Sequence, residues 1–185
     1  MVENMKYSER TISSEYLYQG RILKLRRDLV LLQNGKNVFR EIIEHKGAAA
    51  CLVLTPENKL IFVRQYRHPY KEEILEFPAG RLEKDEEPEK TIIRELQEEV
   101  GIKPLKIEKI GRIYPSPGYT DEIIHLYFTE NYQNFISSLD EDEFLDTLEI
   151  PIKEAFNLLE EGKIVDSKTI VLLLKCKDRL LGRFK

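Results

Sequence analysis

The sequence lacks tryptophan, has only two cysteines, and contains no long apolar run. Cys51 and Cys176 have no CxxC neighbour and no paired histidine, which argues against a zinc site and favours buried, reduced thiols. No apolar segment approaches the roughly 20 residues that a membrane-spanning helix needs, and residues 1–10 are charged where a signal peptide would be apolar. We therefore expect a cytoplasmic protein with no membrane partner.

The sequence also lacks an excess of charge of one sign. Its 185 residues include 29 basic and 33 acidic residues, for a net charge of −4, and no basic run is longer than Arg26-Arg27. Proteins that bind nucleic acid usually carry a basic patch or stripe, so no nucleic-acid partner is expected. Hydrophobic residues make up 42% of the chain, which is enough to form a core.

Strands and helices are predicted without regular alternation, which favours an α+β fold with a mixed sheet between helices. Proline in the first turn and glycine at the end predict a helix at residues 88–100. Two more helices are expected, at residues 151–161 and 167–181. Strands are expected at residues 21–32, 36–44, 48–54, 59–67, 74–77, 106–114, 122–129 and 144–150.

A candidate domain boundary lies near Lys46-Gly47. Residues 1–46 are predicted to form an N-terminal antiparallel β extension, and residues 47–185 to form the main domain. Within the extension, Asn34-Gly35 lies between two predicted strands, which is the signature of a two-residue hairpin turn.

The predicted helix at residues 88–100 carries a cluster of glutamates. Its apolar residues gather on one face, whereas Glu95, Glu98 and Glu99 are neighbours on another. Like charges at this spacing destabilise a helix by about 0.2–0.5 kcal/mol per pair. A divalent cation would remove the repulsion, and carboxylates suit Mg²⁺ or Mn²⁺. The alternative is a solvated acidic face.

The segment at residues 80–102 resembles the Nudix box, GX5EX7REUXEEXGU, in which U is a bulky aliphatic residue. Every specified position matches: Gly80, Glu86, Arg94, Glu95, Leu96, Glu98, Glu99, Gly101 and Ile102. The resemblance implies the Nudix fold, a mixed β-sheet sandwiched between helices, in which the box binds Mg²⁺ and positions a pyrophosphate.

The resemblance also implies residue roles. Glu95 and Glu99 would be metal ligands, and Glu98 would be a ligand or a water-mediated partner. The carbonyl of Ala79, in a Pro-Ala-Gly turn, is a further candidate ligand. Arg94 would orient the glutamates through ion pairs.

Residues outside the box resemble the ADP-ribose pyrophosphatase subgroup of the Nudix family. Ser116-Pro117-Gly118 follows the box as a substrate-binding element does in that subgroup. Arg67 matches an arginine that contacts substrate phosphates, and Arg40 and Glu41 match a pair that reaches substrate near the subunit interface. The strands before Gly47 match the subgroup's dimerisation extension, so the resemblance implies a homodimer.

The acidic loop at residues 139–144 resembles a subgroup loop that supplies glutamates two residues apart. The match assigns Glu141 as general base and Glu143 as a further metal ligand, with Asp142 in reserve. Glu98 is the alternative base. For Glu86, helix capping and a chemical role both remain open.

These resemblances imply an Mg²⁺-dependent pyrophosphohydrolase, with Mn²⁺ as a substitute, that cleaves ADP-ribose to AMP and ribose 5-phosphate. The alternatives are hydrolysis of another nucleoside diphosphate sugar or dinucleotide, such as GDP-mannose, FAD or NADH, and a non-catalytic ADP-ribose sensor. Some subgroup members stack adenine on an aromatic residue just after a glycine of the N-terminal strand. Here Arg21 follows Gly20, so Tyr18 is either a substitute for that residue or a packing residue.

Overall fold

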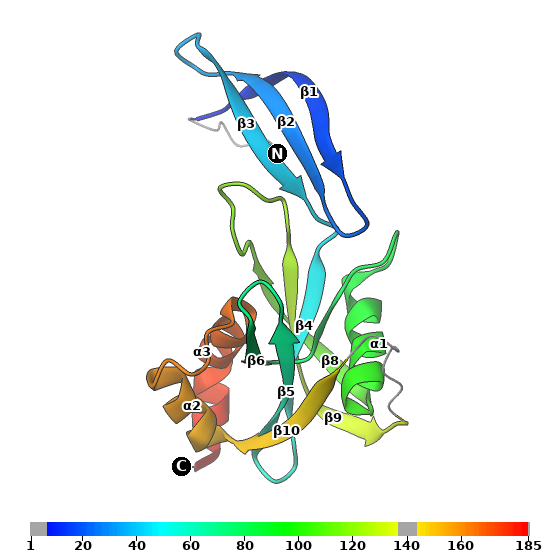
Figure 1. Ribbon diagram of the computed structural model, residues 1–185. Helices are drawn as coiled ribbons and strands as arrows, with labels where there is room; N and C mark the ends of the chain where they lie inside the picture. The colour runs from blue at the N-terminus through cyan, green and yellow to red at the C-terminus, as the bar shows by residue number, and fades with distance from the viewer. Residues whose placement is uncertain (1–6, 137–143, 185) are drawn as a thin grey trace. The chain divides into compact units, whose positions relative to one another are not determined.

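The computed structural model describes residues 7–136 and 144–184 (Figure 1). The chain forms two compact units. The first, called the N-terminal unit below, comprises the residues up to Lys46 together with residues 116–122. The second, called the main unit, comprises the remaining described residues.

The N-terminal unit is a three-stranded antiparallel sheet with the order β1-β2-β3. Its strands are β1 (Arg10–Gln19), β2 (Lys24–Leu31) and β3 (Asn37–Glu44). All residues of β1 are exposed, and in the sheet only Asp28 and Val30 are buried. Large apolar side chains therefore face solvent on this unit, namely Ile12, Tyr16, Leu17, Tyr18, Ile22 and Phe39.

The turn between β2 and β3 differs from the predicted two-residue turn. The N–H of Leu32 donates to the carbonyl of Lys36 at 2.9 Å, so three residues lie between the paired ends. Gly35 has φ 79°, whereas Asn34 does not have a positive φ. A two-residue type I′ turn needs positive φ at both central residues, and the chain instead uses one left-handed glycine at the end of a longer loop.

Residues 116–122 belong to the N-terminal unit because they pair with β3. The N–H of Ile43 donates to the carbonyl of Tyr119 at 2.7 Å, and the N–H of Asp121 donates to the carbonyl of Ile43 at 3.2 Å. The carboxylate of Asp121 also accepts from the N–H of His45 at 2.8 Å. The predicted main domain, residues 47–185, included this segment, and the structure assigns it to the other unit.

The main unit is built on a seven-stranded mixed sheet. The central order is β10-β5-β4-β9-β8, with β6 paired to β5 and β7 paired to β4. The pair β4–β9 is parallel and the other pairs are antiparallel. The strands are β4 (Ala48–Leu54), β5 (Lys59–Arg67), β6 (Glu72–Glu76), β7 (Ala79–Arg81), β8 (Ile102–Ile113), β9 (Ile124–Asn134) and β10 (Leu145–Pro151).

The centre of the sheet is β4, in which all seven residues are buried. It forms the predicted hairpin with β5, but the two strands pair only at their adjoining ends, where Val53 opposes Ile61. On the same edge of β4, the residues that β5 does not pair with are paired with β7. The opposite edge of β4 pairs with β9. A strand buried on both faces reads as a continuous apolar run, which explains its sequence.

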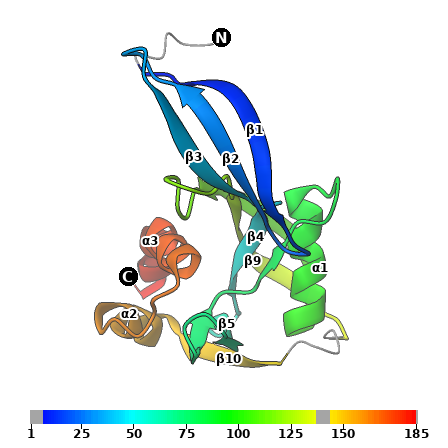
Figure 2. The ribbon, with the colours of Figure 1, turned by 45° about the horizontal axis from the view of Figure 1, so that its top comes forward.

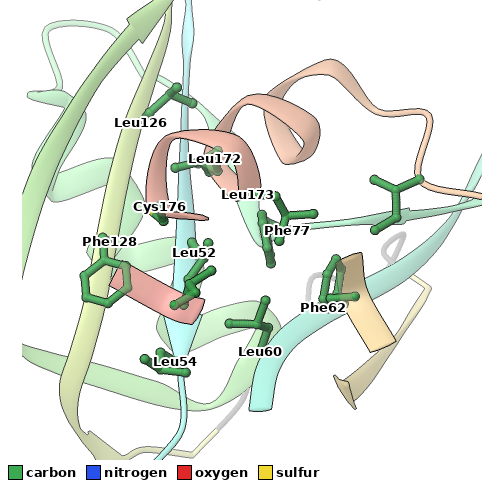
Figure 3. Packing of buried hydrophobic residues seen from close by; sticks show 14 of the residues in the cluster. Leu52, Leu54, Leu60, Phe62, Phe77, Leu126, Phe128, Leu172, Leu173 and Cys176 are labelled. Carbon is green, nitrogen blue, oxygen red and sulfur yellow. The ribbon is translucent and has the colours of Figure 1, made fainter. Parts of the chain in front are cut away.

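Successive side chains of β4 point into two separate cores, as strand geometry requires. Ala50, Leu52 and Leu54 pack with residues of α2 and α3, in the cluster shown in Figure 3. Cys51 and Val53 pack on the other face with residues of α1. The main unit is therefore a sheet between helices, with α1 on one face and α2 and α3 on the other (Figure 2).

The three predicted helices are confirmed. They are α1 (Pro88–Val100), α2 (Ile152–Glu160) and α3 (Ser167–Leu181), and a short 3₁₀ helix, Gly182–Phe184, follows. Gly101 ends α1 in the left-handed conformation at φ 65°, the usual geometry of a glycine helix stop. No helix of the described residues is long and apolar enough to cross a membrane.

Candidate active site

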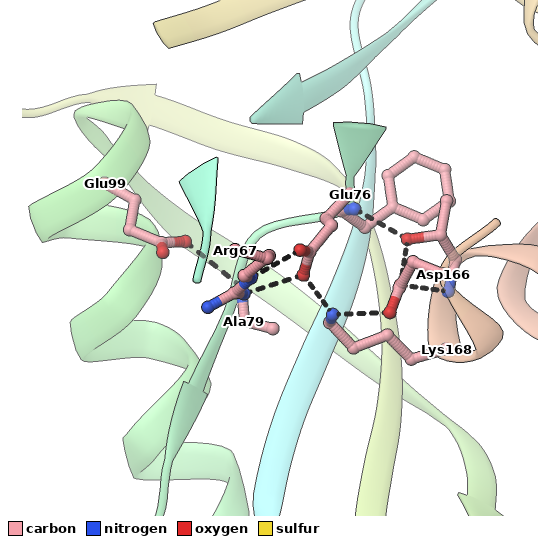
Figure 4. Close-up of polar contacts among 8 residues, drawn as sticks. Arg67, Glu76, Ala79, Glu99, Asp166 and Lys168 are labelled. Carbon is pink, nitrogen blue, oxygen red and sulfur yellow. Dashed lines mark hydrogen bonds and ion pairs between the residues drawn. The ribbon is translucent and has the colours of Figure 1, made fainter. Parts of the chain in front are cut away.

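Helix α1 presents two of its glutamates to strand β7. Glu95 and Glu99 are 8% and 7% exposed, although both are acidic. The N–H of Ala79 in β7 donates to Oε2 of Glu99 at 3.1 Å (Figure 4). Because β7 pairs with the core strand β4, where Ala79 opposes Ala50, the position of this N–H is fixed by the sheet.

The sequence predicted a turn at Pro-Ala-Gly. That prediction is wrong in part, because Ala79 and Gly80 lie in the short strand β7. Gly80 is needed there for space. A Cβ atom built on Gly80 would lie 1.8 Å from Oε1 of Glu95, and the φ of this glycine is not positive. The lack of a side chain leaves room for the carboxylate against the strand, which is a close approach that only glycine allows.

Arg94 forms ion pairs with three glutamates, and its role in orienting them stays a prediction. One of its terminal nitrogens, Nη1, lies 2.8 Å from both Glu95 Oε1 and Glu98 Oε2. Its Nε lies 3.3 Å from Glu86 Oε1. Burial works to lower the pKa of Arg94, but the three glutamates outweigh it and keep the pKa above its usual value. Arg94 is thus a permanent cation that offsets repulsion among acidic side chains.

Glu86 does not cap helix α1 but connects the preceding loop to the helix through hydrogen bonds and an ion pair. The N-cap residue of α1 is Glu87, and no side chain caps the helix there. Glu86 instead accepts from the N–H of Glu83 at 3.1 Å and from Oγ1 of Thr91 at 2.8 Å, in addition to its ion pair with Arg94. Burial acts to raise the pKa of Glu86, but these partners have the larger effect, so the pKa lies below its usual value.

On the other side of Ala79, Arg67 is held by a buried carboxylate that the sequence did not reveal. Nε and Nη2 of Arg67 donate to the two oxygens of Glu76 at 2.6 and 2.8 Å (Figure 4). The pKa of Arg67 is raised by this hydrogen bonding, with further contributions from the charges of Glu76, Asp166 and Glu99. The smallest of these contributions comes from Glu99 on α1.

A second cation, Lys168 of α3, contacts the same carboxylate. Its Nζ is hydrogen-bonded to Glu76 Oε2 and lies 2.9 Å from Asp166 Oδ1. Burial acts to raise the pKa of Glu76, but the hydrogen bonds and charges of Arg67 and Lys168 have the larger effect. The pKa of Glu76 therefore lies below its usual value. The sequence carries no clear signal for this network, because Glu76 is one of three glutamates in β6 and its partner Lys168 lies 92 residues away.

The remaining predicted substrate residues lie on the N-terminal unit. Arg40 is ion-paired with Glu9, at 2.6 Å from Nη2 to Oε1, and Glu41 is exposed. Ser116-Pro117-Gly118 forms a turn in which the carbonyl of Ser116 accepts from the N–H of Thr120 at 3.2 Å. The structure therefore brings these two predicted elements into one unit, and their substrate roles stay predictions.

Glu141, Asp142 and Glu143 lie outside the described residues, so their predicted roles stay predictions. The strand that follows them, β10, contacts α1. Oγ1 of Thr147 donates to the main-chain carbonyl of Glu99 at 3.3 Å. This bond links the strand after the acidic loop to the end of the helix that carries the glutamates.

The chemistry of the donors suits a hard divalent cation. Glu95 and Glu99 offer buried carboxylate oxygens, and the space at Gly80 accommodates one of them against the backbone. Within residues 7–136 and 144–184, no three acidic, histidine or cysteine side chains gather closely enough to hold a metal. The described side chains would therefore need additional oxygens, such as the carbonyl of Ala79, water or substrate phosphate.

Two family models match the chain. The family model described as the NUDIX domain matches residues 44–173, and the model described as the nucleoside diphosphate sugar hydrolase N-terminal domain matches residues 9–43.

Among curated proteins, the chain is 44% identical to the ADP-ribose pyrophosphatase of Bacillus subtilis, over 87% of this chain and 88% of that protein. It is also 44% identical to the methanol dehydrogenase activator of Bacillus methanolicus, over 89% and 90% of the two chains. A solved structure of an ADP compounds hydrolase superposes with a TM-score of 0.83 over 95% of this chain and 96% of that one. At 19% identity, the structural likeness concerns the fold.

Proposed function

The chain belongs to the NUDIX domain family and carries a nucleoside diphosphate sugar hydrolase N-terminal domain, and from this premise we propose that it hydrolyses ADP-ribose to AMP and ribose 5-phosphate. The observation that carries the proposal is the buried pair Glu95 and Glu99 against β7, together with the Arg67 guanidinium that Glu76 holds in place. Carboxylates and a guanidinium so arranged suit a diphosphate that is bound with divalent cations.

Mg²⁺, or Mn²⁺ in its place, would be held by Glu95, Glu99 and the carbonyl of Ala79, and Glu98 and Glu143 are further candidate ligands. The bound cation would neutralise the charge of the diphosphate and lower the pKa of a bound water. Arg94 holds Glu95 in place through its ion pair. Glu98, which also forms an ion pair with Arg94, is proposed as a further metal ligand or as a partner that acts through water.

Arg67 would bind the substrate phosphates. Two of its N–H groups are used by Glu76, and a guanidinium has five, so donors remain for a phosphate oxygen. Glu141 is proposed as the base that takes the proton of the attacking water, with Asp142 in reserve and Glu98 as the alternative. Such a base contributes about 10²- to 10⁴-fold to the rate. Attack on one phosphorus breaks the anhydride and releases AMP and ribose 5-phosphate.

The substrate assignment rests on the relatives. The ADP-ribose pyrophosphatase of Mycobacterium tuberculosis is 36% identical over 89% of this chain, whereas the GDP-mannose pyrophosphatase of Yersinia enterocolitica is 34% identical over 76%. The Bacillus subtilis ADP-ribose pyrophosphatase, at 44% identity, places ADP-ribose first among the candidates, and GDP-mannose is the second candidate substrate. Arg40, Glu41 and Ser116-Pro117-Gly118 are the residues proposed to distinguish substrates.

A hydrolysis panel tests the proposal. Purified protein with saturating Mg²⁺ would be incubated with ADP-ribose, GDP-mannose, FAD and NADH, and the released nucleotides measured by chromatography. We expect the highest kcat/KM for ADP-ribose, with AMP and ribose 5-phosphate formed in equal amounts. A higher value for GDP-mannose would move the assignment to that substrate, and binding of ADP-ribose without hydrolysis would identify a sensor.

We also propose that the protein is a cytoplasmic homodimer joined through the N-terminal unit. The exposed apolar side chains of its sheet support dimerisation, because apolar surface of this kind marks interaction sites. The cysteines support a reducing compartment. Both are free and buried, and burial raises the pKa of the Cys176 thiol to about 11, which disfavours the reactive thiolate.

A further inference from the structure

The network around Glu76 contains a cation that the proposed mechanism does not use. Glu76 is 3% exposed, and its Oε2 accepts from both Nη2 of Arg67 and Nζ of Lys168. The two cations differ in their surroundings. The side chain of Arg67 is 39% exposed, whereas that of Lys168 is 10% exposed. Arg67 therefore offers donors to solvent or ligand, and Lys168 is enclosed by protein.

Lys168 is fixed by the first turn of α3. Its Nζ lies 2.9 Å from Oδ1 of Asp166, which is the N-cap residue of that helix. The other oxygen of Asp166 accepts from the N–H and Oγ1 of Thr169 at 3.0 and 2.6 Å. Oγ1 of Thr169 in turn accepts from the N–H of Phe77, the residue after Glu76, at 2.8 Å. One helical turn thus anchors both the side chain of Glu76 and the backbone beside it.

The arrangement of charges explains why a second cation is needed. A buried carboxylate is strongly destabilised when its charge is not compensated. If Arg67 alone compensated Glu76, any movement of the guanidinium toward a phosphate would leave Glu76 without its counter-ion. Lys168 keeps the carboxylate charged and directed at Arg67 whether or not substrate is present.

We infer, on the basis of the proposed function, that Lys168 is a positioning residue that fixes the Arg67 guanidinium, through Glu76, for binding the substrate diphosphate. The anchor comes from α3, on the opposite face of the sheet from the glutamate helix α1. Helices from both faces therefore contribute to one site, α1 with the acidic groups and α3 with the support for the basic group.

A double-mutant cycle tests this inference on the full-length protein, using Lys168→Met, Arg67→Gln and the double variant. A misplaced binding group can cost up to about 100-fold, and we expect Lys168→Met to lower kcat/KM for ADP-ribose by at least about tenfold. In the Arg67→Gln background the same substitution should change kcat/KM by less than about twofold, because residues that act through one another are not additive. Equal losses in both backgrounds, or no loss in the single variant, would overturn the inference.

Two further variants separate positioning from folding. Lys168→Arg keeps the positive charge and should retain kcat/KM within about threefold of wild type. If only the shape of the lysine side chain mattered, this variant would lose activity as Lys168→Met does. Lys59→Met removes the lysine of an exposed ion pair with Glu149 at the start of β5. It should leave kcat/KM unchanged, and circular dichroism would verify that each variant is folded.

A readout without turnover distinguishes failure of this inference from failure of the proposed function. The ¹⁵N-labelled protein should show a protected Arg67 Nε–H resonance, identified by its loss in Arg67→Gln. We expect that resonance to broaden or exchange rapidly in folded Lys168→Met and to persist in Lys59→Met. If wild type hydrolyses none of the panel substrates, the proposed function fails, while an unchanged resonance in Lys168→Met overturns the positioning role.

Discussion

At the scale of single residues, the site depends on carboxylates placed where burial would ordinarily disfavour them. Glu95 and Glu99 lie on α1 almost out of contact with solvent, and Glu76 lies at the end of β6 in the same condition. Each has a specific partner: Arg94 for Glu95, the Ala79 N–H for Glu99, and Arg67 with Lys168 for Glu76. Hydrogen bonds and ion pairs therefore fix the directions of these three carboxylates.

Replacing Glu99 by glutamine tests its role as a metal ligand. The amide oxygen can still accept from the Ala79 N–H, so the fold should be retained. With saturating Mg²⁺, we expect turnover to fall by at least about 100-fold, since metal stabilisation of charge amounts to several kcal/mol. Glu89→Gln, at an exposed position in the first turn of the same helix, is the matched control. Turnover within a few-fold of wild type would contradict the ligand assignment.

Gly80→Ala tests the close approach of α1 to β7. The added Cβ would overlap Glu95 and force its carboxylate away from the strand. We expect kcat/KM to fall by about 10- to 100-fold, with a loss of about 1–3 kcal/mol in the free energy of unfolding. Gly182→Ala places its Cβ in open space and serves as the control. Kinetics would be measured beside urea denaturation, and an active Gly80→Ala protein would show that the carboxylate needs no such contact.

The lowered pKa of Glu76 predicts a dependence of stability on pH. A carboxyl group whose pKa is lower in the folded state stabilises the protein above the unfolded pKa, near 4.5 for glutamate, and this contribution is lost as the pH falls through the folded pKa. Urea denaturation between pH 7 and pH 3 should therefore show a smaller loss of stability on acidification in Glu76→Gln than in wild type. Parallel curves for the two proteins would mean that the pKa is unchanged by folding.

At the scale of elements, the helices were predictable and the shortest strand was not. Proline at the start and glycine at the end of α1 indicate its bounds, and Gly182 follows the end of α3, where Asp166 caps the start. Strand β7 has three residues, one of them glycine, so no periodicity reveals it. It forms because β5 pairs with only the last two residues of β4 and leaves the remaining edge open.

For the site too, the sequence predicts features within one element but not contacts between distant elements. The clustering of the α1 glutamates follows from their spacing along one helix, whereas their link to Arg94 was implied by the resemblance to the Nudix box. The pairing of Glu76 with Lys168 joins β6 to α3 across 92 residues. Any of several lysines could have been the partner, and only the folded chain selects one.

The contact between α3 and the segment after β6 also makes a prediction about stability. In Thr169→Val the N–H of Phe77 loses its acceptor in a buried environment, while the side-chain shape is kept. A buried donor without a partner costs about 1–3 kcal/mol. Ser167→Ala, in the same helical turn but exposed, should change stability by less than about 0.5 kcal/mol. Urea denaturation measures both, and equal stabilities for the two variants would contradict the role of this bond.

At the scale of the whole molecule, the proposed homodimer raises the question of which chain would supply Arg40 and Glu41 to a given site. Mixed dimers can answer it. A chain with Arg40→Ala and Glu41→Ala would be co-expressed with a chain carrying Glu99→Gln, each being inactive alone. If the pair acts on the partner's site, random assembly should restore about a quarter of wild-type activity, because half the dimers are mixed and each contains one intact site. No restored activity would show that each chain completes its own site or that no dimer forms.

The assignment of residues 116–122 to the N-terminal unit has a consequence for how the chain can be cut. The polypeptide passes from one unit to the other near residues 46, 115 and 122, so the units are joined by three covalent crossings. A protease nick between Lys46 and Gly47 would sever one of them. The released end would still be bound through Ile43 to Tyr119 and Asp121, so the two fragments should migrate together on a native gel and part only in denaturant.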